Sequence, residues 1–152
     1  MGTAVGWGLT PRLMLLLKAS ALWLLILVCA VLNGGLREAV LLPRLGTPVA
    51  LVLSGVLLSA CIVVVSLALV RWLGRLGTLQ ALSVGLFWLC LTLAFEFGFG
   101  RLVQNQTWPE LLEAYTFRDG NIWPLVLVVT FFAPLLAVRA RGRIPGEQQS
   151  GA

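Results

Sequence analysis

The sequence contains no histidine and few charged residues, and both scarcities narrow its chemistry. Without histidine there is no His ligand for haem or zinc, no Ser-His-Asp triad and no imidazole proton relay. Charged residues make up 11% of the 152 residues, whereas they make up about a quarter of a soluble domain. Because 59% of the chain is hydrophobic, a soluble fold of this size has too little interior to bury it, and the excess must face lipid.

Cysteine is also scarce. Cys29, Cys61 and Cys90 each lie in a different apolar run, and no CxxC pair exists. The spacing therefore excludes a dithiol oxidoreductase of the CxxC type and favours cysteine as a small buried apolar residue. We expect no catalytic residue, no metal and no cofactor, and hence no enzyme. The net charge is +5, but the bases flank apolar runs instead of forming a patch with aromatics, so we expect no nucleic-acid partner.

Four long apolar runs organise the chain, at about residues 13–32, 49–70, 79–98 and 122–138. Twenty helical residues rise about 30 Å, the thickness of the hydrocarbon layer. The sequence therefore predicts an all-α, four-helix transmembrane bundle that forms one polytopic membrane domain, 1–138, followed by a polar, disordered cytoplasmic tail, 139–152. A cleaved signal peptide is the alternative for the first run, with Arg12 and Lys18 as its basic region and a cleavage site near Ala30.

Two shorter segments are predicted to be interfacial helices on the outer side. The linker 33–46 has apolar residues at helical spacing; we expect its helix to be entered through Gly34-Gly35 and to stop before Pro43. The second begins at Thr107, where Thr107 and Glu110 have the spacing of a capping box. Both segments fall in the connections on the same side of the four spans.

The distribution of basic residues predicts the orientation. Four spans place seven bases on the side of the termini and four on the other side, which favours cytoplasmic termini. The first set is Arg12, Lys18, Arg71, Arg75, Arg139, Arg141 and Arg143, and the second is Arg37, Arg44, Arg101 and Arg118.

Glu96 is the only acid inside an apolar run. It continues the helical stripe of Gly85, Trp88 and Thr92, which we expect to face the bundle interior. An intramembrane carboxylate suggests function, but Glu96 lies about 25 Å along the helix from the start of the span, at the outer interface. We therefore expect an ion pair with Arg37 or Arg101, and the alternative is a transport role.

Small residues recur on single faces of the predicted spans. Gly55, Ser59 and Ser66 share one stripe of the second span, and Gly85 lies on the third. Such stripes let helices pack closely in lipid, so we expect these residues at helix contacts. A polar translocation path is the alternative for the serine stripe.

Three stretches carry a resemblance: LNGGLREAVLLPRLG at 32–46, EFGFGRLV at 96–103 and TWPELLEAY at 107–115. They resemble small, uncharacterised four-span integral membrane proteins of bacteria, a family without an assigned activity. The resemblance implies a four-span topology in the bacterial inner (cell) membrane. Small multidrug exporters fit poorly, because they carry their carboxylate in the first span.

The function predicted from the sequence is a non-enzymatic scaffold or accessory subunit of a membrane complex. It rests on the small-residue stripes, the interfacial helices and the lack of a catalytic set. The alternatives are a small transporter or channel that uses Glu96, or a protein that binds lipid or quinone. The expected partners are the lipid bilayer and other membrane proteins or a second copy of the chain.

Overall fold

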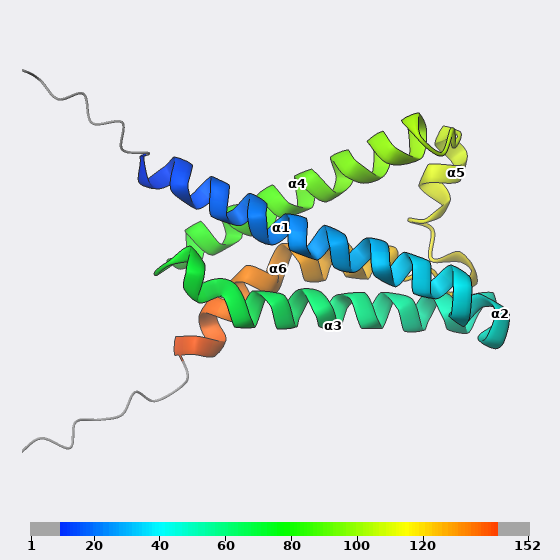
Figure 1. The fold of residues 1–152 in the computed structure, drawn as a ribbon, viewed down its shortest axis with the longest axis horizontal. Helices are drawn as coiled ribbons and strands as arrows, with labels where there is room; N and C mark the ends of the chain where they lie inside the picture. The colour runs from blue at the N-terminus through cyan, green and yellow to red at the C-terminus, as the bar shows by residue number, and fades with distance from the viewer. Residues whose placement is uncertain (1–9, 143–152) are drawn as a thin grey trace, which may run out of the picture.

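Four long helices form the body of the protein, as a computed structural model of residues 10–142 shows (Figure 1). They are α1 (Pro11–Leu36), α3 (Thr47–Leu73), α4 (Thr78–Leu102) and α6 (Trp123–Gly142). Each, with α1 counted through to Leu45, is long and apolar enough to cross a membrane. The prediction of an all-α four-helix bundle is confirmed, and the chain is a polytopic membrane protein.

The remaining elements are short and lie in the connections. They are η1 (Arg37–Leu41), α2 (Leu42–Leu45), α5 (Trp108–Glu113) and η2 (Arg118–Gly120). All four lie at one end of the bundle, which we call the α5 end; the opposite end holds the turn between α3 and α4 and is called the turn end. The helix α6 runs on to Gly142, past the expected end of its span, and residues 143–152 of the expected tail lie outside the described residues.

The first connection differs from the prediction. No break occurs at Gly34-Gly35: α1 continues through both glycines, and η1 and α2 prolong it to Leu45. Pro43 does not end this helix but occupies the first turn of α2. The wide π-type turn of η1, in which the Leu42 N–H bonds to the Arg37 carbonyl, comes directly before Pro43 and accommodates a residue that has no N–H to donate.

The second short helix forms where the sequence predicts it, as α5. Thr107 caps α5, and both its backbone N–H and its hydroxyl donate to Glu110 Oε2, at 2.6 and 2.9 Å. The backbone N–H of Thr107 holds the pKa of the Glu110 carboxyl below its ordinary value, and the hydroxyl of Thr107 lowers it further. The α5 helix is thus fixed at its first turn by its own sequence.

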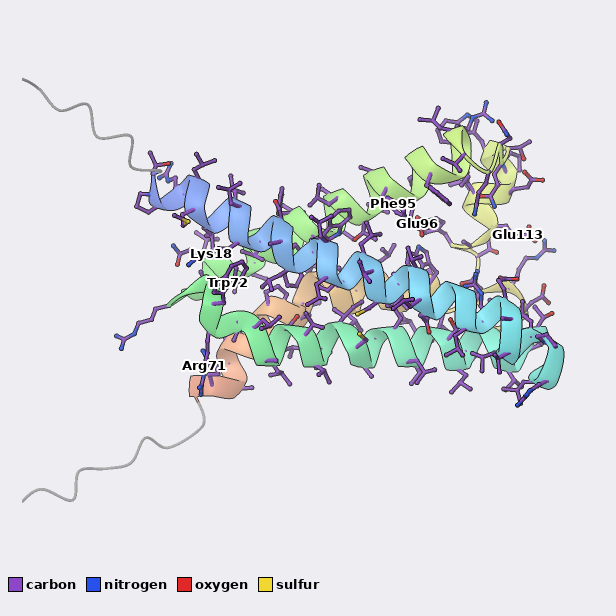
Figure 2. The ribbon with its side chains drawn as sticks, viewed as in Figure 1. Lys18, Arg71, Trp72, Phe95, Glu96 and Glu113 are labelled. Atoms are coloured by element: carbon purple, nitrogen blue, oxygen red, sulfur yellow. The ribbon has the colours of Figure 1, made fainter. Side chains whose placement is uncertain are left out.

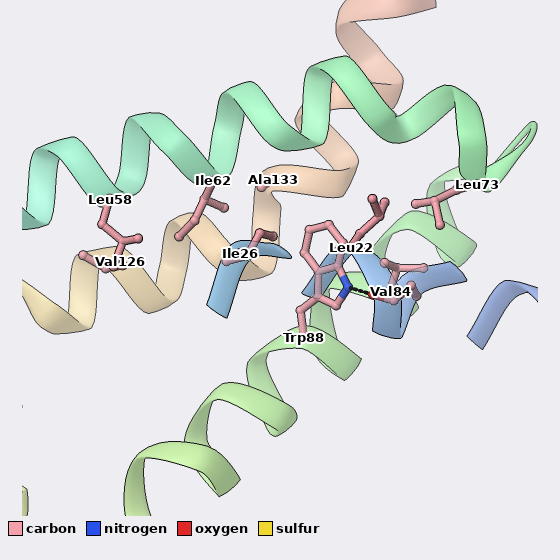
Figure 3. Close-up of a cluster of buried hydrophobic side chains, with 10 residues drawn as sticks. Leu22, Ile26, Leu58, Ile62, Leu73, Val84, Trp88, Val126 and Ala133 are labelled. Atoms are coloured by element: carbon pink, nitrogen blue, oxygen red, sulfur yellow. Dashed lines mark hydrogen bonds between the residues drawn. The ribbon is translucent and has the colours of Figure 1, made fainter. Parts of the chain in front are cut away.

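The hydrophobic core extends from the middle of the bundle toward the turn end (Figure 3). Trp88 of α4 is 1% exposed and packs among residues of α1, α3 and α6. The core cluster consists of Ala19, Leu22, Ile26, Leu58, Ile62, Leu73, Val84, Trp88, Val126 and Ala133. Every one of the four long helices contributes to it, so this half of the bundle is closed.

The closest helix approach is between α4 and α6. A Cβ on Gly85 would overlap the backbone carbonyl oxygen of Phe131, so only glycine lets the two backbones come this near. Pro134 lies inside α6 at the same level and removes one helical hydrogen bond, and α6 changes direction beside Ala133 (Figure 3).

Candidate functional site

Two tryptophans join α1 to α4 in the closed half. The indole N–H of Trp88 donates to the Ala19 carbonyl at 2.9 Å, and that of Trp23 donates to the Thr92 hydroxyl at 3.0 Å. Toward the α5 end, α4 diverges from α1, and α5 with the following loop leads the chain back to α3 and α6 (Figure 1). The stripe of α4 that faces the closed core therefore continues into an open space.

A cavity of about 540 Å³ fills that space. Its wall includes Thr47 through Ile62 of α3, so it extends about 22 Å down that helix from the α5 end. From α4 it receives Thr92, Phe95, Glu96, Phe99 and Gly100. The rest comes from α1, η1, α2, α5, α6 and the connections between α4 and α6. The cavity thus reaches from the α5 end to the middle of the bundle, where the core closes it.

The cavity also opens on the lipid-facing side of the bundle. Val31 of α1 and Phe99 of α4 both line it, yet they are 60% and 40% exposed. Both belong to helices that are apolar enough to span the membrane. An apolar chain therefore has a lateral path between α1 and α4, whereas a polar group has a path from the α5 end.

Aromatic rings form the α4 side of this path. Phe95 stacks on Phe99 with ring centroids 5.4 Å apart, and Trp23 of α1 meets Phe95 edge-on at 6.5 Å. All three rings line the cavity. Figure 2 shows Phe95 and Glu96 on α4 where it diverges from α1. The carboxylate of Glu96 is therefore next to an aromatic wall.

The charges of the cavity differ from those of the chain as a whole. Its charged lining residues are Arg37, Glu38, Glu96 and Glu110, which are three of the chain's six acids but one of its eleven bases. The whole chain carries +5, whereas this lining carries a formal charge of −2 (one base minus three acids). Such a wall attracts cations.

Glu96 does not form the expected ion pairs in the structure. Arg37 donates from Nε and Nη2 to Glu38 Oε1, at 3.2 and 3.1 Å. Arg101 donates to the Gln106 carbonyl at 2.9 Å and lies over the Trp108 ring. Within residues 10–142, no basic nitrogen lies within 4.0 Å of the Glu96 carboxylate.

The reason is geometric. Arg37 is the first residue of η1, which prolongs α1, and it pairs with the carboxylate of the next residue, Glu38. Its positive charge still acts on Glu96 across the cavity. Glu96 is half-buried and lines the cavity, so its carboxylate faces an open space and not a guanidinium.

Two more polar groups lie beside Glu96 without a hydrogen-bond partner in the described part of the chain: the Tyr115 hydroxyl and the Trp123 indole N–H. They lie near each other but not in hydrogen-bond geometry. Burial raises the pKa of Tyr115, the negative charge of Glu96 adds to this, and the Trp123 N–H opposes it. Buried polar atoms are rarely left unpaired in proteins, and Trp123 also lines the cavity.

The predicted packing residues are placed as follows. Besides the Gly85 contact, a Cβ on Gly55 would lie 2.5 Å from Cγ1 of Ile122, so Gly55 packs against the start of α6. Ser66 is 2% exposed, whereas Ser59 is half-buried. The most buried face of α3 is one residue away from Gly55 and Ser59, on Ser54 and Leu58.

Sequence reasoning missed several polar residues of the cavity. Asn33 donates to the hydroxyl of Ser54 at 2.7 Å and to its carbonyl at 3.1 Å, which ties α1 to α3. Gln104, Gln106 and Asn121 line the mouth. In the sequence, the only sign of these polar residues is the amide of Asn33 at the end of an apolar run. Among the residues that the structure describes, no three Cys, Asp or Glu side chains gather closely enough to hold a metal ion.

Comparisons with known proteins add no relative to this picture. No protein-family model matches the sequence, and no curated protein or solved structure is significantly similar to it.

Proposed function

We propose that this protein binds an amphipathic molecule in the cavity between α1 and α4, with the polar head at the α5 end and the apolar chain between the two helices. The observation that carries the proposal is the double opening of the cavity, to the α5 end and to the lipid-facing side. Its volume of about 540 Å³ falls within the range of about 300–1,000 Å³ that is usual for small-molecule sites.

The α5 end faces the outside of a bacterial inner membrane in this proposal. The excess of bases on the side of the termini supports that orientation. The resemblance to four-span bacterial proteins supports the bacterial inner membrane as the location. Lys18 lies over the ring of Trp72 at 5.7 Å at the turn end (Figure 2), where a base and an indole suit an interface. The ligand then enters from the outer leaflet.

The role is binding and not catalysis. It agrees with an accessory subunit that holds a lipid-like molecule and presents it to another membrane protein or to a second copy of the chain. The support is the composition of the wall, which is mainly apolar, with a few amide, hydroxyl and charged side chains. The sequence-based expectation of a scaffold is thereby narrowed to a scaffold that carries a ligand.

A small transporter is the second candidate, and the one-sided cavity favours it over a channel. Access ends at the closed core around Trp88, so an open pore does not fit, whereas an outward-facing state of a carrier does. A carrier requires the Trp88–Ala19 and Trp23–Thr92 contacts to break. Flux into liposomes that is abolished by Glu96→Gln supports the carrier, and binding without flux contradicts it.

The binding proposal is tested with two adjacent glycines. Gly34 lines the cavity and Gly35 does not, and a Cβ on either meets no atom within 4 Å. Gly34→Trp therefore has room for its Cβ and adds an indole at the cavity wall, and Gly35→Trp is its matched control.

Three fluorescent probes share a hexadecyl chain and carry an amine, an alcohol or a carboxylate as the head group. We expect at least one of them to bind the purified protein saturably. Gly34→Trp should weaken that binding by about tenfold or more, because a bulky ring displaces the ligand from a close-packed site, and Gly35→Trp should leave it unchanged. Absence of saturable binding for all three probes, or equal binding by the two variants, would overturn the proposal.

A further inference from the structure

We infer that the amphiphile has a cationic head, an alkylammonium or aminolipid group, and that Glu96 is its counter-ion. This inference rests on the proposed binding function and specifies the chemistry of the ligand. Its basis is the set of charges and rings at the level of Glu96, where the polar mouth of the cavity meets the apolar path.

The other charged groups of the lining already have partners. Arg37 is bound to Glu38 through two donors, so an anionic head meets a guanidinium that is neutralised within its own helix. Glu110 accepts from the backbone and side chain of Thr107. Glu96 is the carboxylate of the described lining that has neither an ion pair nor a hydrogen bond. A cation in the cavity has one free counter-charge, and an anion has none.

The aromatic wall favours the same sign of charge. Phe95 precedes Glu96 in the chain, Phe99 stacks on Phe95, and Trp23 closes the wall from α1. The faces of aromatic rings attract ammonium groups, the more so when water is excluded. The faces of the same rings repel a carboxylate or phosphate. A cationic head therefore gains from the rings as well as from the carboxylate.

Two unpaired polar atoms, the Tyr115 hydroxyl and the Trp123 indole N–H, are buried and have almost no accessible surface. Tyr115 does not line the cavity, so neither atom is counted among the contacts of the head. The charge and the rings come from α4 and α1, so the site exists only in the folded bundle.

The part of the cavity on the core side of Glu96 indicates that the ligand carries an alkyl chain. Ile26 of α1 and Ile62 of α3 line the cavity on the core side of Glu96 and are apolar. Leu27 lies level with Glu96, because the Trp23–Thr92 hydrogen bond sets the register of α1 and α4 one turn earlier. The lateral opening beside Val31, one turn nearer the α5 end than Glu96, lets an alkyl chain longer than the cavity extend into lipid. A free, water-soluble amine would leave this part of the cavity unfilled.

The test compares heads on one chain. We expect hexadecylamine to bind the unmodified protein at least about tenfold more tightly than hexadecanol, and hexadecanoate to bind most weakly, because a poorly solvated ion pair is the strong form of hydrogen bond. Equal binding of the three probes would overturn the inference and leave the proposed function intact. No saturable binding by any probe would overturn both.

Two isosteric variants locate the counter-ion. Glu96→Gln should bring the amine and alcohol affinities to within about twofold of each other, because it removes the charge-assisted contact. Glu113→Gln makes the same change of charge on α5, where Glu113 pairs with exposed Arg118 outside the cavity, and it should keep the preference for the amine. Equal effects of the two variants would contradict the assignment of Glu96.

A third arm separates an amphiphile from a free amine. Ethanolamine carries the ammonium and an oxygen but no chain, and we expect it to displace hexadecylamine only at far higher concentration. Displacement by ethanolamine at concentrations similar to those of the probe would contradict the requirement for a chain. The comparison of heads on the unmodified protein does not depend on how well Glu96→Gln folds.

Discussion

Gly85 gives the sharpest prediction about the packing of the bundle. In Gly85→Ala the new methyl group would overlap the carbonyl oxygen of Phe131 and lie 2.9 Å from its carbonyl carbon. Backbone atoms cannot rotate away as the end of a side chain can, so α4 and α6 must move apart. Overpacking of this kind costs about 1–3 kcal/mol of unfolding free energy. Because the obstructing atoms belong to the backbone, we expect the cost of Gly85→Ala at the upper end of this range.

The matched control is Gly98→Ala on the same helix. A Cβ on Gly98 meets no atom within 4 Å, so this variant gains only the higher helix propensity of alanine, about 1 kcal/mol at most. Gly85→Ala has the same gain, and the difference between the two variants therefore isolates the clash. We expect Gly98→Ala to be more stable than Gly85→Ala by about 1–3 kcal/mol.

The assay is reversible unfolding in mixed detergent micelles, followed by the loss of helical circular dichroism as a denaturing detergent is added. Both variants and the parent are compared at one protein concentration. Equal unfolding free energies of Gly85→Ala and Gly98→Ala would refute the close α4–α6 crossing and, with it, the position at which α4 leaves the bundle.

Three further predictions follow from the same contacts. A cysteine placed at Gln106, in a variant without native cysteines, should react with an impermeant thiol reagent added outside; reaction only after permeabilisation would reverse the orientation. Thr92→Val removes the acceptor of the Trp23 N–H and should lower the unfolding free energy in detergent by about 0.5–2 kcal/mol; an unchanged value would mean that the bond is not formed. The lowered pKa of Glu110 means that its support of α5 is present above the ordinary glutamate pKa and is lost as pH falls through the lower folded value; amide exchange in α5 should therefore speed up at acid pH, and Glu110→Gln should remove that dependence.

Much of the fold could be predicted from the sequence because lipid restricts a chain to few solutions. Twenty-residue apolar runs can only be spanning helices, and the Thr107–Glu110 capping box is a local signal that needs no tertiary contact. The continuity of α1 into α2 was missed. Gly34-Gly35 would weaken a helix in water, but glycine is common in membrane helices, and the wide turn before Pro43 depends on backbone geometry that no residue pattern records.

The cavity could not be predicted in the same way. Its existence depends on the angle at which α4 leaves α1, and that angle follows from the Gly85 contact and the two indole hydrogen bonds, which join residues 69 positions apart. Helix rise predicts that Glu96 lies near the outer interface, but it does not reveal what surrounds the carboxylate. Arg37 has a competing carboxylate next to it in the chain, and only the structure shows which one it binds.

The most direct test of the account is to find where the alkyl chain lies. Hexadecylamine with a photoreactive diazirine in mid-chain is bound to the protein, irradiated, and its adducts are mapped by peptide mass spectrometry. The account predicts adducts on cavity residues of both α1 and α4, such as Leu27 and Phe95, and the loss of these adducts in Gly34→Trp. Adducts confined to outward-facing residues such as Val64 and Leu86, unchanged by that variant, would contradict it.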